Sequence, residues 1–292
     1  EIYRRMGKLD LALEHLKKAA ALAPESMEIA YNQSLLLEAQ GKYDEAVDLL
    51  QKLVARTART DGNYSTGERN NRALFLERLG SIYRTEGRPL LAIETFRKIV
   101  DMGGDEASRG YQEIIDAYRE RKQWTEAAKV TQEAVDKFPN DRALKLMLAT
   151  QLADEGQADE SVKVARSLLK GQAEDREAYL GISQVYARLK RWQEAEEALA
   201  AAEKISNRPE DREYVLFLRG SLYERQKKID LAEQTFRQVL QQDPNNTMTL
   251  NYLGYMMADH NQHLEESLAM IKKALAADPQ NGAYLDSLGW VY

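Results

Sequence analysis

The residues of this chain best suited to chemistry are two histidines, His260 and His263, which stand three positions apart near Asp259 and Glu266. Imidazole and carboxylate groups at this spacing are potential ligands of a transition metal. The sequence offers no further strong ligand beside them, and a polar turn often brings such residues together. We therefore expect no metal site here, and we expect the third histidine, His15, to be an ordinary surface or packing residue.

Nucleophilic catalysis has no candidate in this sequence. The chain has no cysteine, which excludes disulfides, cysteine–zinc sites and thiol nucleophiles and is compatible with a reducing or an oxidising compartment. No serine motif stands near a histidine, as an activated serine would require, and no glycine-rich phosphate loop follows a strand. We expect no catalytic residue, no cofactor and no enzymatic activity.

The charge of the chain limits its partners. A net charge of −6 over 292 residues argues against nucleic acid or an anionic membrane as the main partner, because both are bound by basic patches. No apolar stretch approaches the ~18 residues needed to span a bilayer. We expect the partner to be another protein or a peptide.

One stretch shows how the chain is organised. Its apolar residues recur every three to four positions, as on one face of a helix, first before and then after a glycine turn. A glycine inside the first helix lets a neighbouring helix approach closely, although it costs about 1 kcal/mol there. The residues of this pattern are Leu76, Leu79, Gly80, Tyr83, Gly87, Ala92 and Phe96.

The same pattern recurs along the chain at nearly constant spacing. Repeats begin near residues 27, 73, 108, 142, 176, 213 and 247, with a half repeat at 1–24 and a partial repeat from 282. One helix pair cannot bury its apolar face alone, whereas stacked pairs form a continuous core. Because both ends fall inside a repeat, we expect the full protein to continue past Tyr292 with at least one more helix.

Residues 58–72 interrupt the repeats. Gly, Asn, Ser and Thr dominate there, and no apolar period is present. We expect an exposed loop inserted between two repeats. Such a loop is either a functional segment or a solvated spacer.

This pattern resembles the tetratricopeptide repeat (TPR), a helix–turn–helix unit of 34 residues, with Leu in place of its leading Trp. The resemblance covers nearly the whole chain. It implies an all-α, right-handed α–α superhelix, a TPR solenoid of seven near-complete repeats with a half repeat at each end, forming a single domain over 1–292. It also implies a scaffold or adaptor that holds a peptide segment or partner subunit in a concave groove lined by first helices. The alternative is a targeting region of a larger enzyme whose catalytic domain lies outside this stretch.

A narrower resemblance concerns two segments near the C-terminus. Leu250-Asn-Tyr-Leu-Gly-Tyr255 and the segment 282–292 are similar to stretches common in bacterial TPR proteins. Among these are exported lipoproteins that act as adaptors for a periplasmic processing protease. The resemblance implies a bacterial origin and favours the periplasm over the cytoplasm.

The register of the repeats selects the residues that would line such a groove. They stand one and five positions after the leading apolar residue of each first helix, and two before it. Apolar and aromatic groups would anchor a peptide, and amides and hydroxyls would bind its backbone. In repeats five to nine they are Leu146, Thr150, Leu180, Gln184, Tyr214, Phe217, Ser221, Met248, Asn251, Tyr255, Asp286 and Trp290.

Two interpretations of these residues remain open. In the first, a binding hot spot is formed by Leu180, Phe217, Asn251 and Tyr255. In the second, some of them pack against neighbouring helices of the solenoid. The same face in repeats two to four is polar, either a solvated surface or a second site; it comprises Tyr31, Leu35, Glu77, Ser81, Gln112 and Asp116, with Arg84, Arg109 and Arg119 nearby.

Overall fold

The computed structural model describes residues 2–172 and 175–292. Within these ranges every extended regular element is an α-helix and no strand occurs. The chain divides into two compact units, Glu1–Leu144 (unit 1) and Lys145–Tyr292 (unit 2). None of the helices in the described part is long and apolar enough to cross a membrane.

The helices of unit 1 are α1 (Ile2–Arg5), α2 (Leu9–Leu22), α3 (Met27–Ala39), α4 (Tyr43–Arg56), α5 (Thr66–Thr85), α6 (Pro89–Asp101), α7 (Glu106–Glu120) and α8 (Trp124–Lys137). The unit boundary falls within α9 (Arg142–Asp154). Unit 2 continues with α10 (Ala158–Arg166), α11 (Arg176–Arg188), α12 (Trp192–Lys204), α13 (Pro209–Arg225), α14 (Ile229–Gln242), α15 (Thr247–Asp259), α16 (Leu264–Ala277) and α17 (Gly282–Val291).

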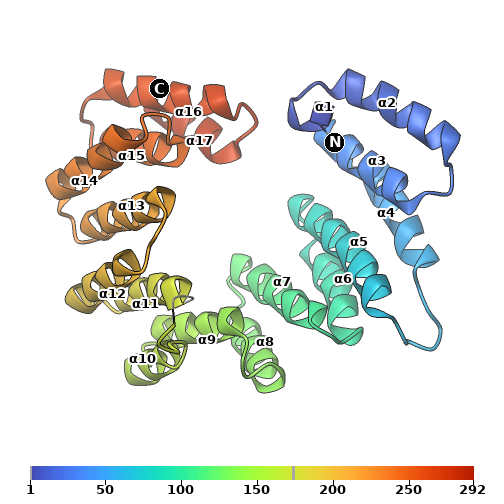
Figure 1. Ribbon diagram of the computed structural model, residues 1–292, viewed down its shortest axis with the longest axis horizontal. Helices are drawn as coiled ribbons and strands as arrows, with labels where there is room; N and C mark the ends of the chain where they lie inside the picture. Colours follow the sequence, from blue (N-terminus) through green and yellow to red (C-terminus); the bar gives the residue numbers. More distant parts are fainter. Residues whose placement is uncertain (1, 173–174) are drawn as a thin grey trace. The chain divides into compact units, whose positions relative to one another are not determined.

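Each repeat is a pair of helices packed side by side, as Figure 1 shows for α5 with α6 and for α11 with α12. The odd-numbered helices from α3 to α17 are the first helices of the repeats, and the even-numbered helices from α2 to α16 are the second helices. Successive pairs also pack together, as α6 does on α7 and α12 on α13. The prediction of an all-α helical-repeat fold is confirmed.

The turn inside each repeat ends the first helix with one residue in the left-handed conformation. Gly87 has φ 68°, and the amide of Arg88 donates to the carbonyl of Tyr83 at 2.8 Å. This is a Schellman motif, in which the left-handed residue is usually glycine because a Cβ is disfavoured there. In three repeats a lysine takes this position, at φ between 57° and 61°: Lys122, Lys190 and Lys227.

A proline followed two positions later by a polar residue marks several junctions between repeats. Pro244 cannot continue the preceding helix, and Asn246 then accepts a hydrogen bond on Oδ1 from the amide of Thr249 at 3.0 Å. Ser26 and Asp141 accept the equivalent bond at the start of α3 and α9. Each side chain satisfies one of the free amides at a helix N-terminus.

The inserted loop is shorter than the sequence analysis predicted. Helix α5 begins at Thr66, so residues 66–72 form about two helical turns instead of loop. The reason is a capping box: Ser65 Oγ accepts from the Glu68 amide at 3.4 Å, and Glu68 Oε2 accepts from the Ser65 amide at 2.8 Å. The loop is therefore 58–65, and Arg59 ties it to the helix through Glu68 at 2.8 Å.

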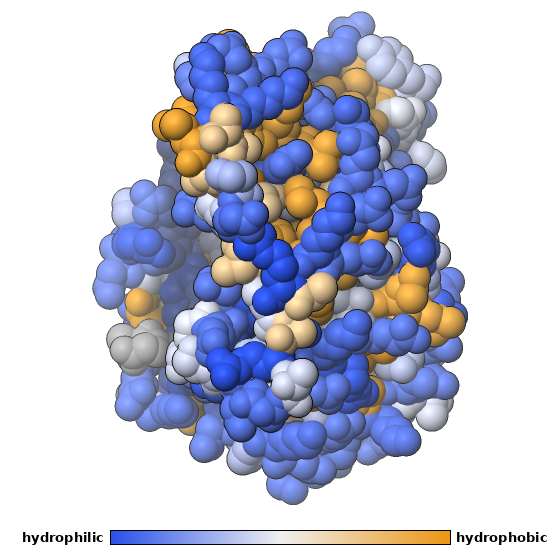
Figure 2. All heavy atoms as spheres, turned by 90° about the vertical axis from the view of Figure 1, so that its right-hand side faces the viewer, coloured by the Kyte–Doolittle hydropathy of each residue, from blue (hydrophilic) through white to orange (hydrophobic). Residues whose placement is uncertain are grey.

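Most of the surface seen in Figure 2 is hydrophilic, and apolar residues form separate patches between polar ones. Helices from α3 to α16 bury residues on one side and expose others. With 30% charged residues, the chain has enough polar side chains to cover most of these outer faces. Apolar residues that remain exposed on a first helix are therefore candidates for contact with a partner.

Candidate partner-binding face

Five successive first helices carry the groove residues predicted for repeats five to nine: α9, α11, α13, α15 and α17. We call the surface formed by these residues of unit 2 the first-helix face. Its large exposed side chains are Tyr214 and Tyr255, each 38% exposed, and Trp290, 59% exposed. Met248 is exposed beside them at 38%.

Two of these aromatic residues lie next to each other although 35 residues separate them in the chain. The ring centroids of Tyr255 on α15 and Trp290 on α17 are 6.2 Å apart. Aromatic groups that are large, rigid and partly exposed are the residues that most often anchor a protein interface. The pair is the largest exposed aromatic surface that the face offers.

Leu180 and Phe217, expected as anchors, are instead buried, with 4% and 8% exposure. The ring of Phe217 packs against Phe236 at 5.5 Å and against Tyr252 at 5.3 Å between centroids. Tyr214 stacks on the same ring, with 6.4 Å between centroids. For these two residues the second interpretation applies, because they pack between helices of the unit.

Leu146 and Thr150 are also occupied within the unit. A Cβ added to Gly181 would lie 2.5 Å from Cδ2 of Leu146, so the leucine packs directly on the backbone of α11. The hydroxyl of Thr150 donates to the carbonyl of Leu146 at 2.8 Å. The leucine side chain and the threonine hydroxyl therefore already have partners within the unit.

A hydrogen-bond chain joins α13 to α15 beside the face. The hydroxyl of Tyr252 donates to Glu224 Oε2 at 2.6 Å and lies 3.3 Å from Ser221 Oγ. Burial, and then the bond to the Glu224 carboxylate, raise the pKa of Tyr252 to about 12. The phenol therefore stays protonated at neutral pH and keeps donating to Glu224.

Asn251, also on α15, presents an unused hydrogen-bond acceptor. Its side-chain Oδ1 is out of contact with solvent and has no hydrogen-bond partner among the described residues. The residue itself is partly exposed. An acceptor left in this state costs about 1–3 kcal/mol, but an atom out of contact with solvent is also out of reach of a partner docked on this face.

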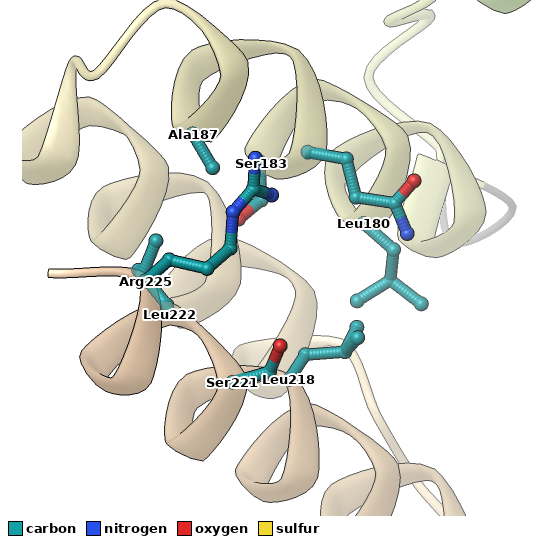
Figure 3. A pocket seen from close by; sticks show the side chains of 8 residues that line it. Leu180, Ser183, Ala187, Leu218, Ser221, Leu222 and Arg225 are labelled. Atoms are coloured by element: carbon teal, nitrogen blue, oxygen red, sulfur yellow. The ribbon is translucent and has the colours of Figure 1, made fainter. Parts of the chain in front are cut away.

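A hollow of about 40 Å³ opens between α11 and α13 (Figure 3). We call it the α11–α13 hollow. Its apolar walls are Leu180, Ala187, Leu218 and Leu222, and its polar groups are Ser183, Gln184, Ser221 and Arg225. Figure 3 shows the side chain of Arg225 reaching from α13 toward α11. The hollow has room for one small side chain, surrounded by hydroxyl, amide and guanidinium donors.

Three residues of this hollow, Leu180, Gln184 and Ser221, were predicted from the sequence as groove residues, whereas Ser183 and Ala187 on α11 were not. Leu218, Leu222 and Arg225 on α13 were not predicted either. Their spacing of four and three residues puts them on one helical stripe beside Ser221. That stripe is the signal from which they could have been found.

The corresponding face of unit 1 is crossed by ion pairs. Arg84 on α5 pairs with Glu113 at 2.7 Å and with Glu120, and Arg109 on α7 pairs with Glu77 at 3.4 Å. Desolvation by burial raises the pKa of Glu77, against the attraction of Arg109. The charges of this face are thus largely balanced within unit 1.

The histidines are not arranged as a metal site. In the part of the chain that the structure describes, no group of three or more His, Asp or Glu residues could hold a metal ion. His260 Nδ1 lies 2.8 Å from the carbonyl of Met256. Glu266 is bound through both carboxylate oxygens to Arg237, at 2.7 and 2.9 Å.

Family models of the tetratricopeptide repeat match most of the chain. One matches residues 1–63 and 146–212, a second matches 110–141 and 214–246, and a third matches 74–102. The matched segments include helices of both units.

Two curated relatives match parts of the chain. A TPR repeat-containing protein of Pseudomonas aeruginosa is 36% identical over 92 residues, which is 32% of this chain and 15% of that protein. The human protein O-mannosyl-transferase TMTC1 is 24% identical over 179 residues, which is 60% of this chain and 20% of that protein. The matches thus span a fifth or less of the length of these relatives.

Solved structures share the fold at low identity. A tetratricopeptide repeat protein of Parabacteroides merdae has a TM-score of 0.58 at 14% identity, covering 90% of this chain and 98% of that one. Yeast Tom70 has a TM-score of 0.60 at 15% identity, covering 99% of this chain and 71% of that one. At this identity the likeness concerns the fold alone.

Proposed function

Because the chain belongs to the tetratricopeptide repeat family, we propose that it is a scaffold that binds an extended segment of a partner protein along the first-helix face of unit 2. One observation carries this proposal. Large apolar and aromatic side chains stay exposed on three first helices, where a soluble repeat would otherwise place polar groups. They are Tyr214 on α13, Met248 and Tyr255 on α15, and Trp290 on α17.

The chemistry of the face suits a peptide better than a small molecule. The α11–α13 hollow is only about 40 Å³ in volume, far below the 300–1,000 Å³ that is typical of a small-molecule pocket. An extended chain would instead contact several neighbouring helices, with its side chains on Tyr255 and Trp290.

The test is capture of a partner from a lysate of the organism that makes the protein. We compare the wild-type chain with the double variant Tyr255→Ala/Trp290→Ala. Removing aromatic anchors from an interface typically costs at least 2 kcal/mol, or about 30-fold in affinity. We expect the captured protein to be lost with this variant.

The control changes apolar residues on second helices whose exposure lies between that of Tyr255 and that of Trp290. Leu231 on α14 and Leu264 on α16 are each 44% exposed, so Leu231→Ala/Leu264→Ala removes exposed apolar groups from second helices. Capture should persist with this control. Equal loss with both variants would place the partner elsewhere and remove the basis of the proposal.

A second candidate function is recruitment of a substrate to a catalytic domain in the same full-length protein. The match to a fifth of a human protein O-mannosyl-transferase favours it. In that case the captured partner would be chemically modified by the full-length protein and not by residues 1–292 alone. Mass spectrometry of the partner after each incubation distinguishes this function from a scaffold without catalysis.

A further inference from the structure

We infer that the α11–α13 hollow selects an Asp or Glu side chain next to a small apolar residue of the bound segment, with Arg225 as the partner of the carboxylate. This specificity rests on the proposed function and refines it. The refinement states which kind of partner residue binds at this one part of the first-helix face.

The first observation is that Arg225 has no counterion in the unit. Its guanidinium makes no ion pair or hydrogen bond within the part of the chain that the structure describes, although it lies at the hollow. Other arginines of the unit's first helices are paired. Arg219 binds Glu196 at 2.6 Å and Arg188 binds Asp154 at 2.7 Å.

The nearby carboxylates are already engaged. Glu224, next to Arg225 in the chain, accepts the hydroxyl of Tyr252 at 2.6 Å. Asp154 belongs to the pair with Arg188. The other polar groups of the hollow, Ser183, Gln184 and Ser221, are neutral. Glu224 keeps its negative charge in this bond and, like Arg225, acts on the Tyr252 hydroxyl. No carboxylate of the described residues pairs directly with the Arg225 guanidinium, so the guanidinium is available to a carboxylate of a bound segment.

The second observation is the size of the hollow. Leu180, Leu218 and Leu222 wall a space of about 40 Å³, which holds a small apolar side chain and excludes an aromatic or long aliphatic one. The residue beside the acid is therefore small. Arginine binds a carboxylate through two parallel hydrogen bonds, which fixes the acid relative to that neighbour.

The experiment is selection of random short peptides, displayed on phage with the peptide C-terminus blocked by fusion, against the whole chain 1–292 and against Arg225→Glu. From the wild type we expect Asp or Glu to be enriched beside a small apolar residue, above all Ala. From Arg225→Glu we expect Lys or Arg at the same position. Lys227→Glu is the control, because it reverses an exposed charge two residues away and should leave the acidic preference unchanged.

Affinities of the selected peptide measure the same pairing. Changing its acid to the neutral amide should weaken binding to the wild type by about tenfold to a hundredfold, the usual range for a charge-assisted hydrogen bond. The same change should have little effect on Arg225→Gln. Circular dichroism establishes that both variants remain helical.

Three outcomes would overturn the inference. The first is an acidic preference that persists in Arg225→Glu. The second is selected peptides that depend on Tyr255 and Trp290 but carry no acid, which leaves the proposed function standing. The third is binding only by synthetic peptides with a free terminal carboxylate, which assigns Arg225 to a chain end. If no peptide binds the wild type, the proposed function fails as well.

Discussion

Gly80 on α5 and Phe96 on α6 share one space. A Cβ added to Gly80 would lie 2.6 Å from Cζ of the phenylalanine and closer still to Cε1, and real Cβ atoms do not approach neighbours so closely. Phe96 is fully buried. The ring of the second helix therefore fills the place that the missing side chain of the first helix leaves open.

The same relation recurs at the same position of other repeats. A Cβ on Gly220 would lie 2.7 Å from Phe236, and one on Gly254 would lie 2.8 Å from Ile271. Where the first-helix residue is larger, the second-helix residue is smaller. These further pairs, all buried, are Ser34 with Leu50, Ser183 with Leu199, Ala149 with Ala165, and Ile115 with Thr131.

The first prediction follows from this exchange of volume. Gly80→Ser should destabilise unit 1 by about 1–3 kcal/mol, because it overpacks the crossing with Phe96. Adding Phe96→Leu gives the Ser–Leu combination that Ser183 and Leu199 form in unit 2, and it should restore much of the lost stability. Urea unfolding of both single variants and the double variant gives the coupling energy, which we expect at about 0.5–3 kcal/mol.

Gly67 provides the control for this series. It lies in the first turn of the same helix, and an added Cβ would meet no atom within 4 Å. Gly67→Ala should leave stability unchanged or raise it by up to about 1 kcal/mol, since alanine favours helix. Additive effects of Gly80→Ser and Phe96→Leu would contradict the shared space.

The second prediction concerns the turn. Lys190 adopts φ 58° at the position where Gly87 stands in another repeat. Lys190→Gly should stabilise unit 2 by about 0.5–1 kcal/mol, because glycine adopts this conformation without a Cβ penalty. The reverse change, Gly87→Lys, should destabilise unit 1 by a similar amount. Only the left-handed backbone conformation opposes it, because no atom lies within 4 Å of the added Cβ and no steric clash is added. A denaturation midpoint that falls for Lys190→Gly would show that its side chain is needed instead.

The third prediction concerns pH. Bonds from the Ser65 amide and hydroxyl, and then from Arg59, lower the pKa of Glu68 from 4.5 to about 2. A lowered folded-state pKa contributes stability that is present above the unfolded value and is lost as pH falls through the folded value. The cap of α5 should therefore loosen between about pH 4.5 and pH 2.

Hydrogen exchange of the amides at the start of α5 measures this effect. Protection at Glu68 and its neighbours should fall across that range in the wild type. In Glu68→Gln it should be lower at neutral pH and nearly independent of pH. Equal protection in both proteins would mean that the capping box does not hold the end of the loop.

The fourth prediction concerns the link between α13 and α15. Tyr252→Phe keeps the ring contacts with Phe217 and Phe236 but removes the bond to Glu224. We expect a loss of stability of about 1.5–3 kcal/mol, the range for a hydrogen bond to a charged group.

This contribution depends on pH. The raised pKa of Tyr252, about 12, stabilises the fold below the unfolded value of about 10, and this contribution is lost as pH rises through 12. The stability difference between wild type and Tyr252→Phe should therefore shrink between about pH 10 and pH 12.

Most of the fold could be predicted from the apolar residues that recur at helical spacing. Leu76, Leu79 and Phe96 are buried on the helix faces where they were predicted. The prediction was secure because the same spacing of apolar residues recurs in several repeats. The start of α5 was missed although the capping box Ser65-x-x-Glu68 stood in the sequence. A composition rich in Gly and Asn hid a local signal that decides where a helix begins.

The binding face was harder to predict, because register gives the direction of a side chain and not its exposure. Phe217 points where its position requires, yet Tyr252, 35 residues away, covers its ring. Tyr255 and Trp290, four positions further along their helices in the same register, lie against each other yet remain 38% and 59% exposed. Exposure depends on the size of neighbours from the next repeat, which spacing alone does not supply.

Site-specific photocrosslinking tests the scaffold account most directly. A benzophenone side chain replaces Tyr255 on the first-helix face or, as the control, Leu231 on a second helix, two positions of similar exposure, 38% and 44%. On irradiation in cells of the source organism, position 255 should form an adduct with one partner protein and position 231 should not. The same adduct from both positions, or none from position 255 while 231 reacts, would contradict binding along the first-helix face.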